Sequence, residues 1–125
     1  MTVQPADVPQ SESTALETAQ RVLNLEAEGI QALCRSLGAE FDSAARLLYE
    51  TEGRVVVSGM GKSGHVARKI AATLASTGTP GLFVHPAEAS HGDLGMIAPG
   101  DTVIILSNSG ETGEVADMVD YCRRF

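Results

Sequence analysis

Glycine and serine gather in a short segment that follows an apolar run. The segment is Gly59-Met60-Gly61-Lys62-Ser63-Gly64, which has the spacing G-x-G-x-x-G. Glycines at this spacing let the backbone approach an anion at the amino end of a helix. A dinucleotide site fits poorly because the second strand is not followed by an acid before Glu88, and a P-loop fails because Val56 replaces its first glycine. We predict a general anion loop that includes Gly61 and Ser63, with a plain strand-to-helix turn as the alternative.

A second polar segment, residues 107–114, follows another apolar run. Its hydrogen-bonding side chains are Ser107, Asn108, Ser109 and Thr112. Such side chains, together with the free N–H groups at the start of a helix, can hold a phosphate without a fixed cation. The alternative is simple N-capping by Ser109 or Thr112, which accounts for one hydroxyl but not for three. Two such loops after two parallel strands place their ligands in the same crevice.

A third segment, residues 85–95, contains histidines on either side of an acid. His85-x-x-Glu88-x-x-His91 suggests a metal site, but on a helix the two histidines point about 120° apart. Because no third ligand is evident, we expect no metal. His91 lies in a glycine-flanked loop, where a titratable imidazole suits proton transfer, although a structural histidine is the ordinary alternative.

The remaining pattern supplies the elements that position these loops. Short β-branched runs bounded by turn residues predict strands, and apolar residues at a spacing of three and four predict helices. Strands that alternate with helices indicate an α/β fold with an open parallel sheet. The predicted strands span 54–58, 81–84 and 102–106, and the predicted helices span 14–37, 41–53, 63–76 and 86–90. A last helix is predicted from the apolar face of Val115, Met118, Val119 and Cys122, with Arg123 and Arg124 at its carboxyl end.

The amino-terminal part of the chain has a different character. Residues 1–13 read as a flexible leader, and residues 14–125 as the folded part. Thr14 and Glu17 fit a capping box at the start of the first helix. We expect the apolar stripes of both amino-terminal helices to pack into the core, and Cys34 and Cys122 to be free, buried thiols.

Composition excludes several classes of function. The chain has 125 residues, and 9 bases against 16 acids give a net charge of −7, which disfavours nucleic acid as a partner. No apolar stretch is long enough to cross a bilayer, and the start lacks the pattern of a secretory signal. We therefore expect a cytoplasmic protein without a membrane or nucleic-acid partner.

Four segments together resemble one known family. They are Gly59-Met60-Gly61-Lys62-Ser63-Gly64-His65, Ala75-Ser76-Thr77-Gly78-Thr79-Pro80, His91-Gly92-Asp93-Leu94-Gly95-Met96 and Ser107-Asn108-Ser109-Gly110-Glu111. The chain resembles the arabinose-5-phosphate isomerases of the sugar isomerase (SIS) domain group. The likeness runs from about Leu16 to Phe125 and is densest between Arg54 and Glu114. The Ser-x-Ser-Gly-Glu loop alone indicates only the SIS group, and the other segments make the match specific.

The resemblance implies a reaction and a set of site residues. The reaction interconverts D-arabinose 5-phosphate and D-ribulose 5-phosphate through a cis-enediol, and in Gram-negative bacteria it feeds synthesis of the lipopolysaccharide sugar Kdo. Phosphate would be held by hydroxyls that match Ser63, Ser107, Ser109 and Thr112. Family active-site positions match Lys62, His91 and Glu114. A small sugar phosphate would be the ligand, no cofactor is implied, and the family forms homo-oligomers, either dimers or tetramers.

The chain also departs from the family pattern. Complete SIS domains continue with further strands and helices, so we expect an incomplete SIS domain with two amino-terminal helices and about three strands. Two further functions therefore remain open beside the isomerase: a non-catalytic sugar-phosphate-binding module, and an inactive truncated remnant. Glu114 as a base, His91 as a proton shuttle or ring-opening group, and Lys62 as a charge stabiliser are hypotheses.

Overall fold

The computed structural model describes residues 14–125, and the predicted leader at residues 1–13 lies outside the described part. The chain divides into two compact units, one ending at Phe41 and the other spanning Asp42–Phe125. No helix of the described residues is long and apolar enough to cross a membrane.

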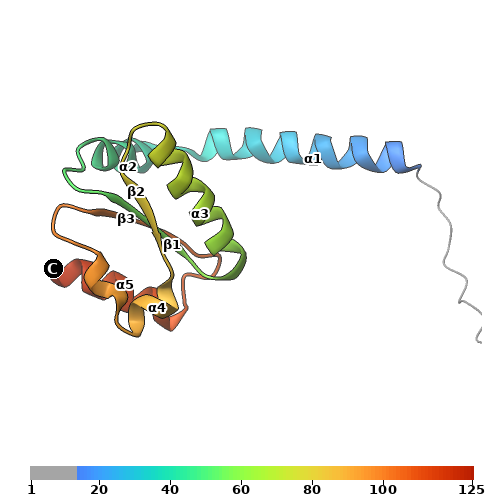
Figure 1. Ribbon diagram of the computed structural model, residues 1–125. Helices are drawn as coiled ribbons and strands as arrows, with labels where there is room; N and C mark the ends of the chain where they lie inside the picture. The colour runs from blue at the N-terminus through green and yellow to red at the C-terminus, as the bar shows by residue number, and fades with distance from the viewer. Residues whose placement is uncertain (1–13) are drawn as a thin grey trace, which may run out of the picture. The chain divides into compact units, whose positions relative to one another are not determined.

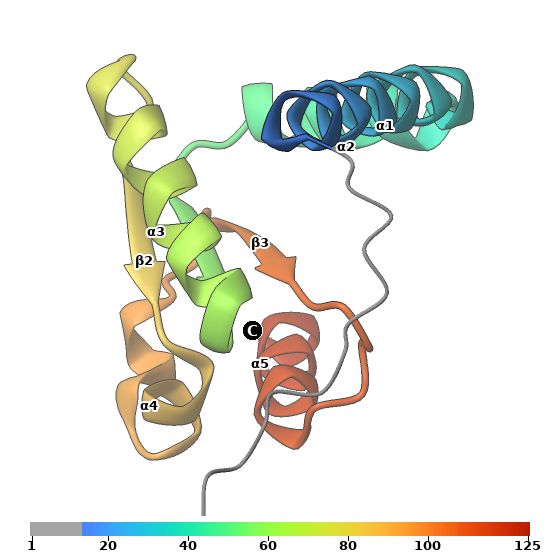
Figure 2. The ribbon, with the colours of Figure 1, turned by 90° about the vertical axis from the view of Figure 1, so that its right-hand side faces the viewer.

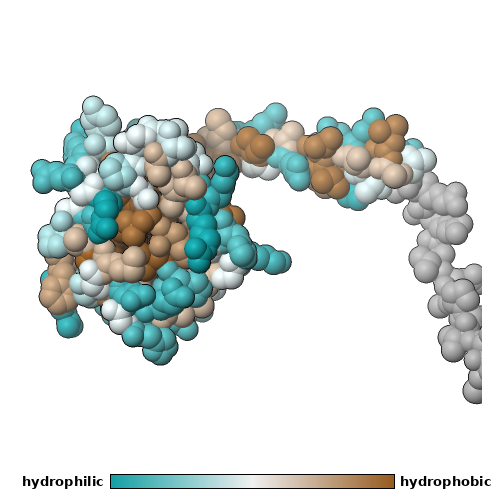
Figure 3. Space-filling model, viewed as in Figure 1, coloured by the Kyte–Doolittle hydropathy of each residue, from teal (hydrophilic) through white to brown (hydrophobic). Residues whose placement is uncertain are grey.

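Helix α1 (Ala15–Ser36) begins at the predicted capping box. The Thr14 hydroxyl accepts from the backbone N–H of Glu17, and the Glu17 carboxylate accepts from the N–H of Thr14. The prediction that its apolar stripe packs into the core is wrong, because none of its residues is buried and Ile30 is 69% exposed. The stripe is visible as brown side chains along α1 in Figure 3. Cys34, on the same helix, is likewise exposed rather than buried.

The second helix, α2 (Ala39–Tyr49), ends four residues before the predicted stop at Gly53. None of its residues is buried, so the core prediction is also wrong here. Leu48 is half-buried against residues of the core, whereas Leu47 is 59% exposed. The helical period of the sequence identifies an apolar face but does not identify what covers it.

The described residues contain one sheet of three parallel strands in the order β2-β1-β3. The strands are β1 (Val55–Gly59), β2 (Gly81–Val84) and β3 (Thr102–Leu106). The central strand β1 is buried throughout, as its β-branched run predicts for a strand covered on both faces. In register, Val55 pairs with Gly81 on one side and with Thr102 on the other.

Helices cover both faces of this sheet (Figures 1 and 2). Helix α3 (Gly61–Ser76) packs on one face, where its small residues Ala67 and Ala71 meet Val55 and Val57. Helices α4 (Pro86–Ser90) and α5 (Gly113–Arg124), with the 3₁₀ turn η1 (Asp93–Met96), cover the other face. There Val56, Val84, Ala89, Ile97 and Met118 form the core. The alternation of side chains along β1 therefore divides the core into two layers.

An ion pair links the amino-terminal ends of β1 and β3. The Asp101 carboxylate accepts from the guanidinium of Arg54 at 2.8 Å and from the backbone N–H groups of Arg54 and Ala98 at 2.8 and 3.0 Å. Arg54 also donates to the carbonyl of Met96 at 2.7 Å. Burial by itself would raise the pKa of Asp101, but hydrogen bonds and the charge of Arg54 outweigh it and lower that pKa to about 2.

Candidate functional site

The order of the strands defines where a ligand can enter. The chain leaves β1 towards α3 and β2 on one side, and returns to β3 on the other side of β1. The segments that follow β1 and β3 therefore diverge at a topological switch point. In open α/β sheets, ligands bind in the crevice at the carboxyl ends of the strands at such a point. The two polar loops predicted from the sequence, residues 59–64 and 107–114, follow β1 and β3 and therefore lie at this end of the sheet.

Backbone geometry explains the glycines of the loop between β1 and α3. Gly61 has a φ of +53°, a left-handed conformation that side chains disfavour. Gly64 lies so close to β1 that a Cβ atom there would come within 2.6 Å of the Gly59 carbonyl oxygen. The amino end of α3 is thereby held tightly against the carboxyl end of β1. Ser63 is half-buried and Lys62 is exposed in the first turn of α3.

The loop between β3 and α5 presents several hydroxyl groups. The Ser107 oxygen accepts from the N–H of Gly110 at 2.8 Å, and the Ser109 oxygen accepts from the N–H of Glu111 at 3.3 Å. Each hydroxyl that accepts from the backbone keeps its own O–H, which can donate to an anion. Asn108 is exposed beside them. These bonds give the two serines a fixed orientation before any ligand binds.

Thr112 is the most informative residue of this loop. It occupies the N-cap position of α5, but its side chain makes no capping hydrogen bond. Its Oγ1 atom is buried and, among the described residues, is the buried side-chain polar atom without a hydrogen-bond partner. A buried polar group without a partner costs about 1–3 kcal/mol. The alternative of simple capping therefore does not account for this threonine, whose buried oxygen is left without a hydrogen-bond partner.

Two helix amino termini add to the attraction for an anion. Helices α3 and α5 begin at Gly61 and Gly113, within the two polar segments 59–64 and 107–114. The first N–H groups of a helix lack internal partners and carry about half a positive charge in total. Helices that begin next to adjacent strands direct these groups to one crevice. A phosphate could therefore be held by hydroxyl and N–H donors together.

The candidate catalytic residues come from three different elements. Lys62 lies in the first turn of α3, His91 is the C-cap of α4, and Glu114 lies in the first turn of α5. Glu114 is half-buried, whereas Lys62 and His91 are exposed. Elements α4 and α5 are joined next to these residues by the Ser90 hydroxyl, which donates to the Asp117 carboxylate at 3.0 Å. His91 and Glu114 thus extend from two helices that are hydrogen-bonded to each other.

The structure gives His85 a local role. Its Nδ1 atom accepts from the N–H of Ala87 at 3.2 Å and caps α4, and its ring meets Phe83 edge to face. Within residues 14–125, no group of three or more histidine, cysteine or acidic side chains could hold a metal ion.

Sequence reasoning missed two polar contacts that shape the site. Ser58, in β1, donates to the carbonyl of Val84 at 2.6 Å and so ties together the ends of β1 and β2. The contact between Ser90 and Asp117 spans 27 residues and leaves no local pattern. Of these two contacts, only that of Ser58 could have been suspected from the sequence, because Ser58 is a polar residue at the end of a β-branched run.

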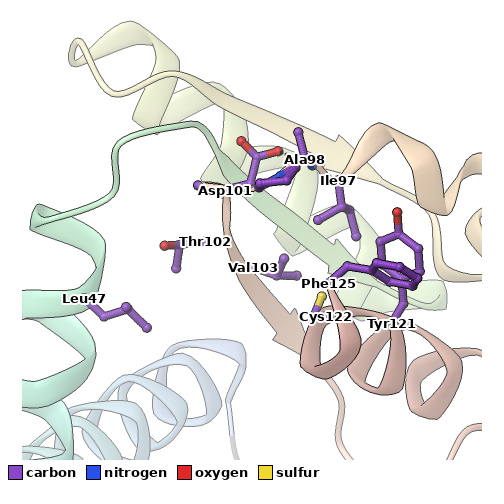
Figure 4. A pocket seen from close by; sticks show the side chains of 11 residues that line it. Leu47, Ile97, Ala98, Asp101, Thr102, Val103, Tyr121, Cys122 and Phe125 are labelled. Carbon is purple, nitrogen blue, oxygen red and sulfur yellow. Dashed lines mark hydrogen bonds between the residues drawn. The ribbon is translucent and has the colours of Figure 1, made fainter.

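The cavity in Figure 4 is not part of this site. It has a volume of about 460 Å³ and is lined by the start of β3 and the last turn of α5, including Thr102, Val103, Tyr121, Cys122 and Phe125. These residues belong to the amino-terminal end of the sheet, opposite the polar loops. Burial raises the pKa of the Cys122 thiol in this wall.

Comparison with known proteins identifies similar chains. The SIS domain family matches residues 47–125. Arabinose 5-phosphate isomerase KdsD of Pseudomonas aeruginosa is 55% identical over 109 residues, which are 87% of this chain and 33% of that protein. The enzyme of the same name from Escherichia coli K12 is 48% identical over 108 residues, again 33% of its length. This chain therefore spans about a third of the curated relatives it matches.

A solved structure is also similar. It is an Escherichia coli CFT073 protein in complex with A5P, with a TM-score of 0.81 and 41% sequence identity. The match covers 92% of this chain and 61% of that one. The predicted α/β fold with a three-stranded parallel sheet is confirmed by this likeness and by the structure itself.

Proposed function

This chain belongs to the SIS domain family, and we propose that it forms the sugar-phosphate-binding part of an arabinose-5-phosphate isomerase. The observation that carries the proposal is the pair of loops at the switch point, above all the buried and unpartnered Thr112 hydroxyl. The similarity to named isomerases and to a chain in complex with A5P, which we take to be arabinose 5-phosphate, supports the same ligand.

The phosphate group is the part of the substrate that these loops suit best. Its oxygens would accept from the hydroxyls of Ser63, Ser107, Ser109 and Thr112, with Gly61 and Asn108 completing the loops. Fixed dipoles aimed at a bound anion need no rearrangement when the ligand arrives. The net charge of −7 would repel a phosphate at long range. The hydroxyl and amide donors of these loops carry no net charge and would act on the phosphate only at hydrogen-bond distance.

The chemistry requires a proton to move between two carbons. A base takes the proton from C2 of the open-chain aldose while the carbonyl oxygen at C1 gains a proton, which gives the cis-enediol. The ketose forms when C1 of this enediol gains a proton and the hydroxyl at C2 loses one, so that the carbonyl group then lies at C2. We assign the base to Glu114, which is half-buried at the start of α5. His91 would open the sugar ring or carry protons between oxygens, and Lys62 would stabilise negative charge on the enediolate or phosphate.

The place of the reaction follows from the proposed substrate. Ribulose 5-phosphate would be converted to arabinose 5-phosphate for the lipopolysaccharide sugar Kdo. Assignment of residues 14–46 to the same domain, a cytoplasmic location and a homo-oligomeric state remain predictions of the sequence.

Binding without turnover is the second candidate function. It is favoured by the exposure of Lys62 and His91, because charge-stabilising and proton-transferring groups act most strongly where water is excluded. Phosphate binding at the two loops does not require these side chains to be buried. The two candidates therefore share one ligand and differ only in turnover.

A paired measurement separates these functions. The full chain is assayed for conversion of arabinose 5-phosphate to ribulose 5-phosphate, and its melting temperature is titrated with arabinose 5-phosphate and, as a control, with arabinose. A melting shift with the phosphate ester only, together with turnover, supports the isomerase. The same shift without turnover supports the binding module. No shift with either sugar would contradict the proposed site.

A further inference from the structure

Two contacts hold the imidazole ring of His85. Its Nδ1 atom accepts from the backbone N–H of Ala87 at 3.2 Å, which makes His85 the N-cap of α4. Its ring also lies edge to face with that of Phe83, at a centroid distance of 6.2 Å and an interplanar angle of 74°. A hydrogen bond and a ring contact together restrict both side-chain torsions, so the orientation of this imidazole is set by the fold.

The Phe83 ring is itself fixed by α3. The Arg68 guanidinium lies over the face of this ring, 4.0 Å from its centroid. The Cζ atom of Phe83 lies 3.8 Å from the position that a Cβ atom would take on Gly64, in the first turn of α3. The imidazole of His85 therefore contacts a ring that reaches the amino end of α3. All these contacts come from β2, α3 and α4, each of which is described along its whole length.

The hydrogen bond at Nδ1 determines which ring nitrogen carries the proton. A backbone N–H can only donate, so the Nδ1 atom of His85 is the acceptor and has no proton. In a neutral imidazole the other nitrogen is then the donor. The two nitrogens lie on either side of Cε1, so the Nε2–H of His85 is directed away from the N–H of Ala87. His85 thus combines a structural acceptor with a hydrogen-bond donor of fixed direction.

The register of the sheet places this donor beside the first polar loop. Ser58 of β1 pairs with Val84 of β2, so the next residues, Gly59 and His85, lie side by side at the carboxyl ends of these strands. Gly59 begins the polar loop 59–64. The proposed phosphate position, between the loops after β1 and β3, lies on the other side of β1 from β2. A ligand with its phosphate there that extends across the end of β1 therefore reaches the end of β2.

We propose that the Nε2–H of His85 donates to a hydroxyl oxygen of the sugar, which makes His85 a substrate-binding residue. This inference rests on the proposed function, because the phosphate position is taken from the two loops. The sugar lies across the end of β1 and directs a hydroxyl group towards β2. His91, the proposed proton carrier, follows in the same segment after β2, so the reacting end of the sugar lies on this side as well. Inorganic phosphate has no sugar hydroxyl and does not use this donor.

Capping of α4 alone does not account for a histidine at this position. The residues that fill N-cap positions best are asparagine, aspartate, serine and threonine, and histidine is not among them. Each of these shorter side chains supplies the acceptor that the N–H of Ala87 requires. Only the imidazole adds a donor on the far side of its ring from that acceptor. The choice of histidine is therefore explained by the donor at Nε2 rather than by the cap.

Two substitutions separate the cap from the donor. His85→Asn keeps an acceptor near the position of Nδ1 and is a good N-cap, but it has no group at the position of Nε2. His85→Gln places an amide donor near the position of Nε2 and caps poorly. By calorimetry we expect His85→Asn to lose about fivefold in affinity for arabinose 5-phosphate, with unchanged affinity for inorganic phosphate and an unchanged melting temperature. His85→Gln should melt at a lower temperature and keep more of the affinity for arabinose 5-phosphate.

The outcomes distinguish this inference from the proposed function. Equal affinity for arabinose 5-phosphate in the unaltered chain and in a folded His85→Asn chain would overturn the role of His85 alone. Equal losses for arabinose 5-phosphate and inorganic phosphate would also overturn it, because the substitution would then act through the phosphate loops. If the unaltered chain binds neither ligand, the proposed function and this inference both fail.

NMR spectra of the imidazole nitrogens provide a readout that needs no ligand and no altered fold. In two-bond ¹H–¹⁵N spectra of the unaltered chain at alkaline pH, we expect His85 to show the tautomer with its proton on Nε2, and the signals to be assigned by their loss in His85→Asn. Addition of arabinose 5-phosphate should shift the Nε2 signal, and addition of inorganic phosphate should not. A proton on Nδ1, or an Nε2 signal that arabinose 5-phosphate leaves unchanged while it binds, would contradict the proposal.

Discussion

At the scale of single residues, the Thr112 hydroxyl would connect folding to the proposed ligand binding. Its Oγ1 atom is buried without a partner, so it costs stability in the free chain, and in the proposed site an anion would supply the missing hydrogen bond. Residues that are suboptimal for folding are typical of functional sites, where binding compensates for the cost.

Replacement of this threonine should change stability and affinity in opposite directions. Thr112→Val keeps the shape and removes the hydroxyl, so we expect the free chain to be stabilised by about 0.5–2 kcal/mol. The affinity for arabinose 5-phosphate should fall about tenfold, the value of one hydrogen bond to a charged group. Denaturant unfolding and calorimetry measure the two effects. Thr112→Ser, which retains a hydroxyl, should keep the affinity; equal affinity in Thr112→Val would refute the role given to Oγ1.

The ion pair between Arg54 and Asp101 should make the free energy of unfolding depend on pH in the acidic range. The pKa of Asp101 is about 2 in the folded chain and about 3.9 in an unfolded one. A lowered folded pKa contributes stability above the unfolded value, and the contribution is lost as the pH falls from about 5 to 2. After allowance for solvent screening we expect a loss of about 1–2 kcal/mol. Asp101→Asn should be less stable at pH 7, and its free energy of unfolding should change less between pH 5 and pH 2 than that of the unaltered chain. The same pH dependence in both chains would contradict the role given to Asp101.

The two thiols should differ in reactivity. Cys34 is exposed, whereas burial raises the pKa of Cys122 and so reduces its thiolate fraction at pH 7. Labelling of the native chain with a thiol reagent should therefore show one fast and one slow phase. Cys34→Ser should remove the fast phase only. Loss of the slow phase in that variant would show that the environments are assigned wrongly.

Sequence reasoning at this scale succeeded for side chains within one loop and failed for partners far apart. The hydroxyl residues between β3 and α5 form a dense local pattern, so the order of amino acids alone is enough to select them. Asp101 and Arg54 are 47 residues apart, and their pairing follows from strand register, which the sequence did not reveal. The missing partner of Thr112 likewise depends on atoms from the fold around it, which leave no local pattern.

At the scale of elements, strand boundaries were predicted to within one residue, since β1 spans Val55–Gly59 where 54–58 was predicted. The bounds of β2 and β3 are those predicted, because turn residues limit both apolar runs. Helix α3 begins two residues earlier than predicted, at Gly61. Glycine is a poor helix former, so the first turn of α3 was not visible in the pattern. Helix α1 was predicted correctly, but the burial of its apolar stripe was not. The sequence pattern of an amphipathic helix is the same whether or not another element covers its apolar face.

The close approach of α3 to β1 gives a prediction for this element. Gly64→Ala would bring a Cβ atom within 2.6 Å of the Gly59 carbonyl oxygen, and both groups belong to backbone. Helix α3 must then move away from β1, which should cost about 1–3 kcal/mol of stability and weaken phosphate binding. Gly113→Ala, where the added atom meets nothing within 4 Å, is the matched control. Equal stability of the two variants by thermal unfolding would contradict the packing described.

At the scale of the whole molecule, the two polar loops of the proposed site belong to one of the two compact units. The loops depend on β1, β3 and the helices that follow them, all within residues 42–125. The chain spans a third of its curated relatives. The proposed phosphate binding therefore rests on residues of this chain, whereas the proposed turnover would also depend on how well Lys62, His91 and Glu114 are enclosed.

The central claim is that a sugar phosphate binds between the loop after β1 and the loop after β3. Amide NMR of the full chain during titration with arabinose 5-phosphate tests it most directly, with arabinose as the control. We predict saturable shifts concentrated at residues 59–64 and 107–114, and none with arabinose at the same concentrations. Shifts concentrated around the cavity of Tyr121 and Phe125, or no saturable shifts at all, would contradict the account.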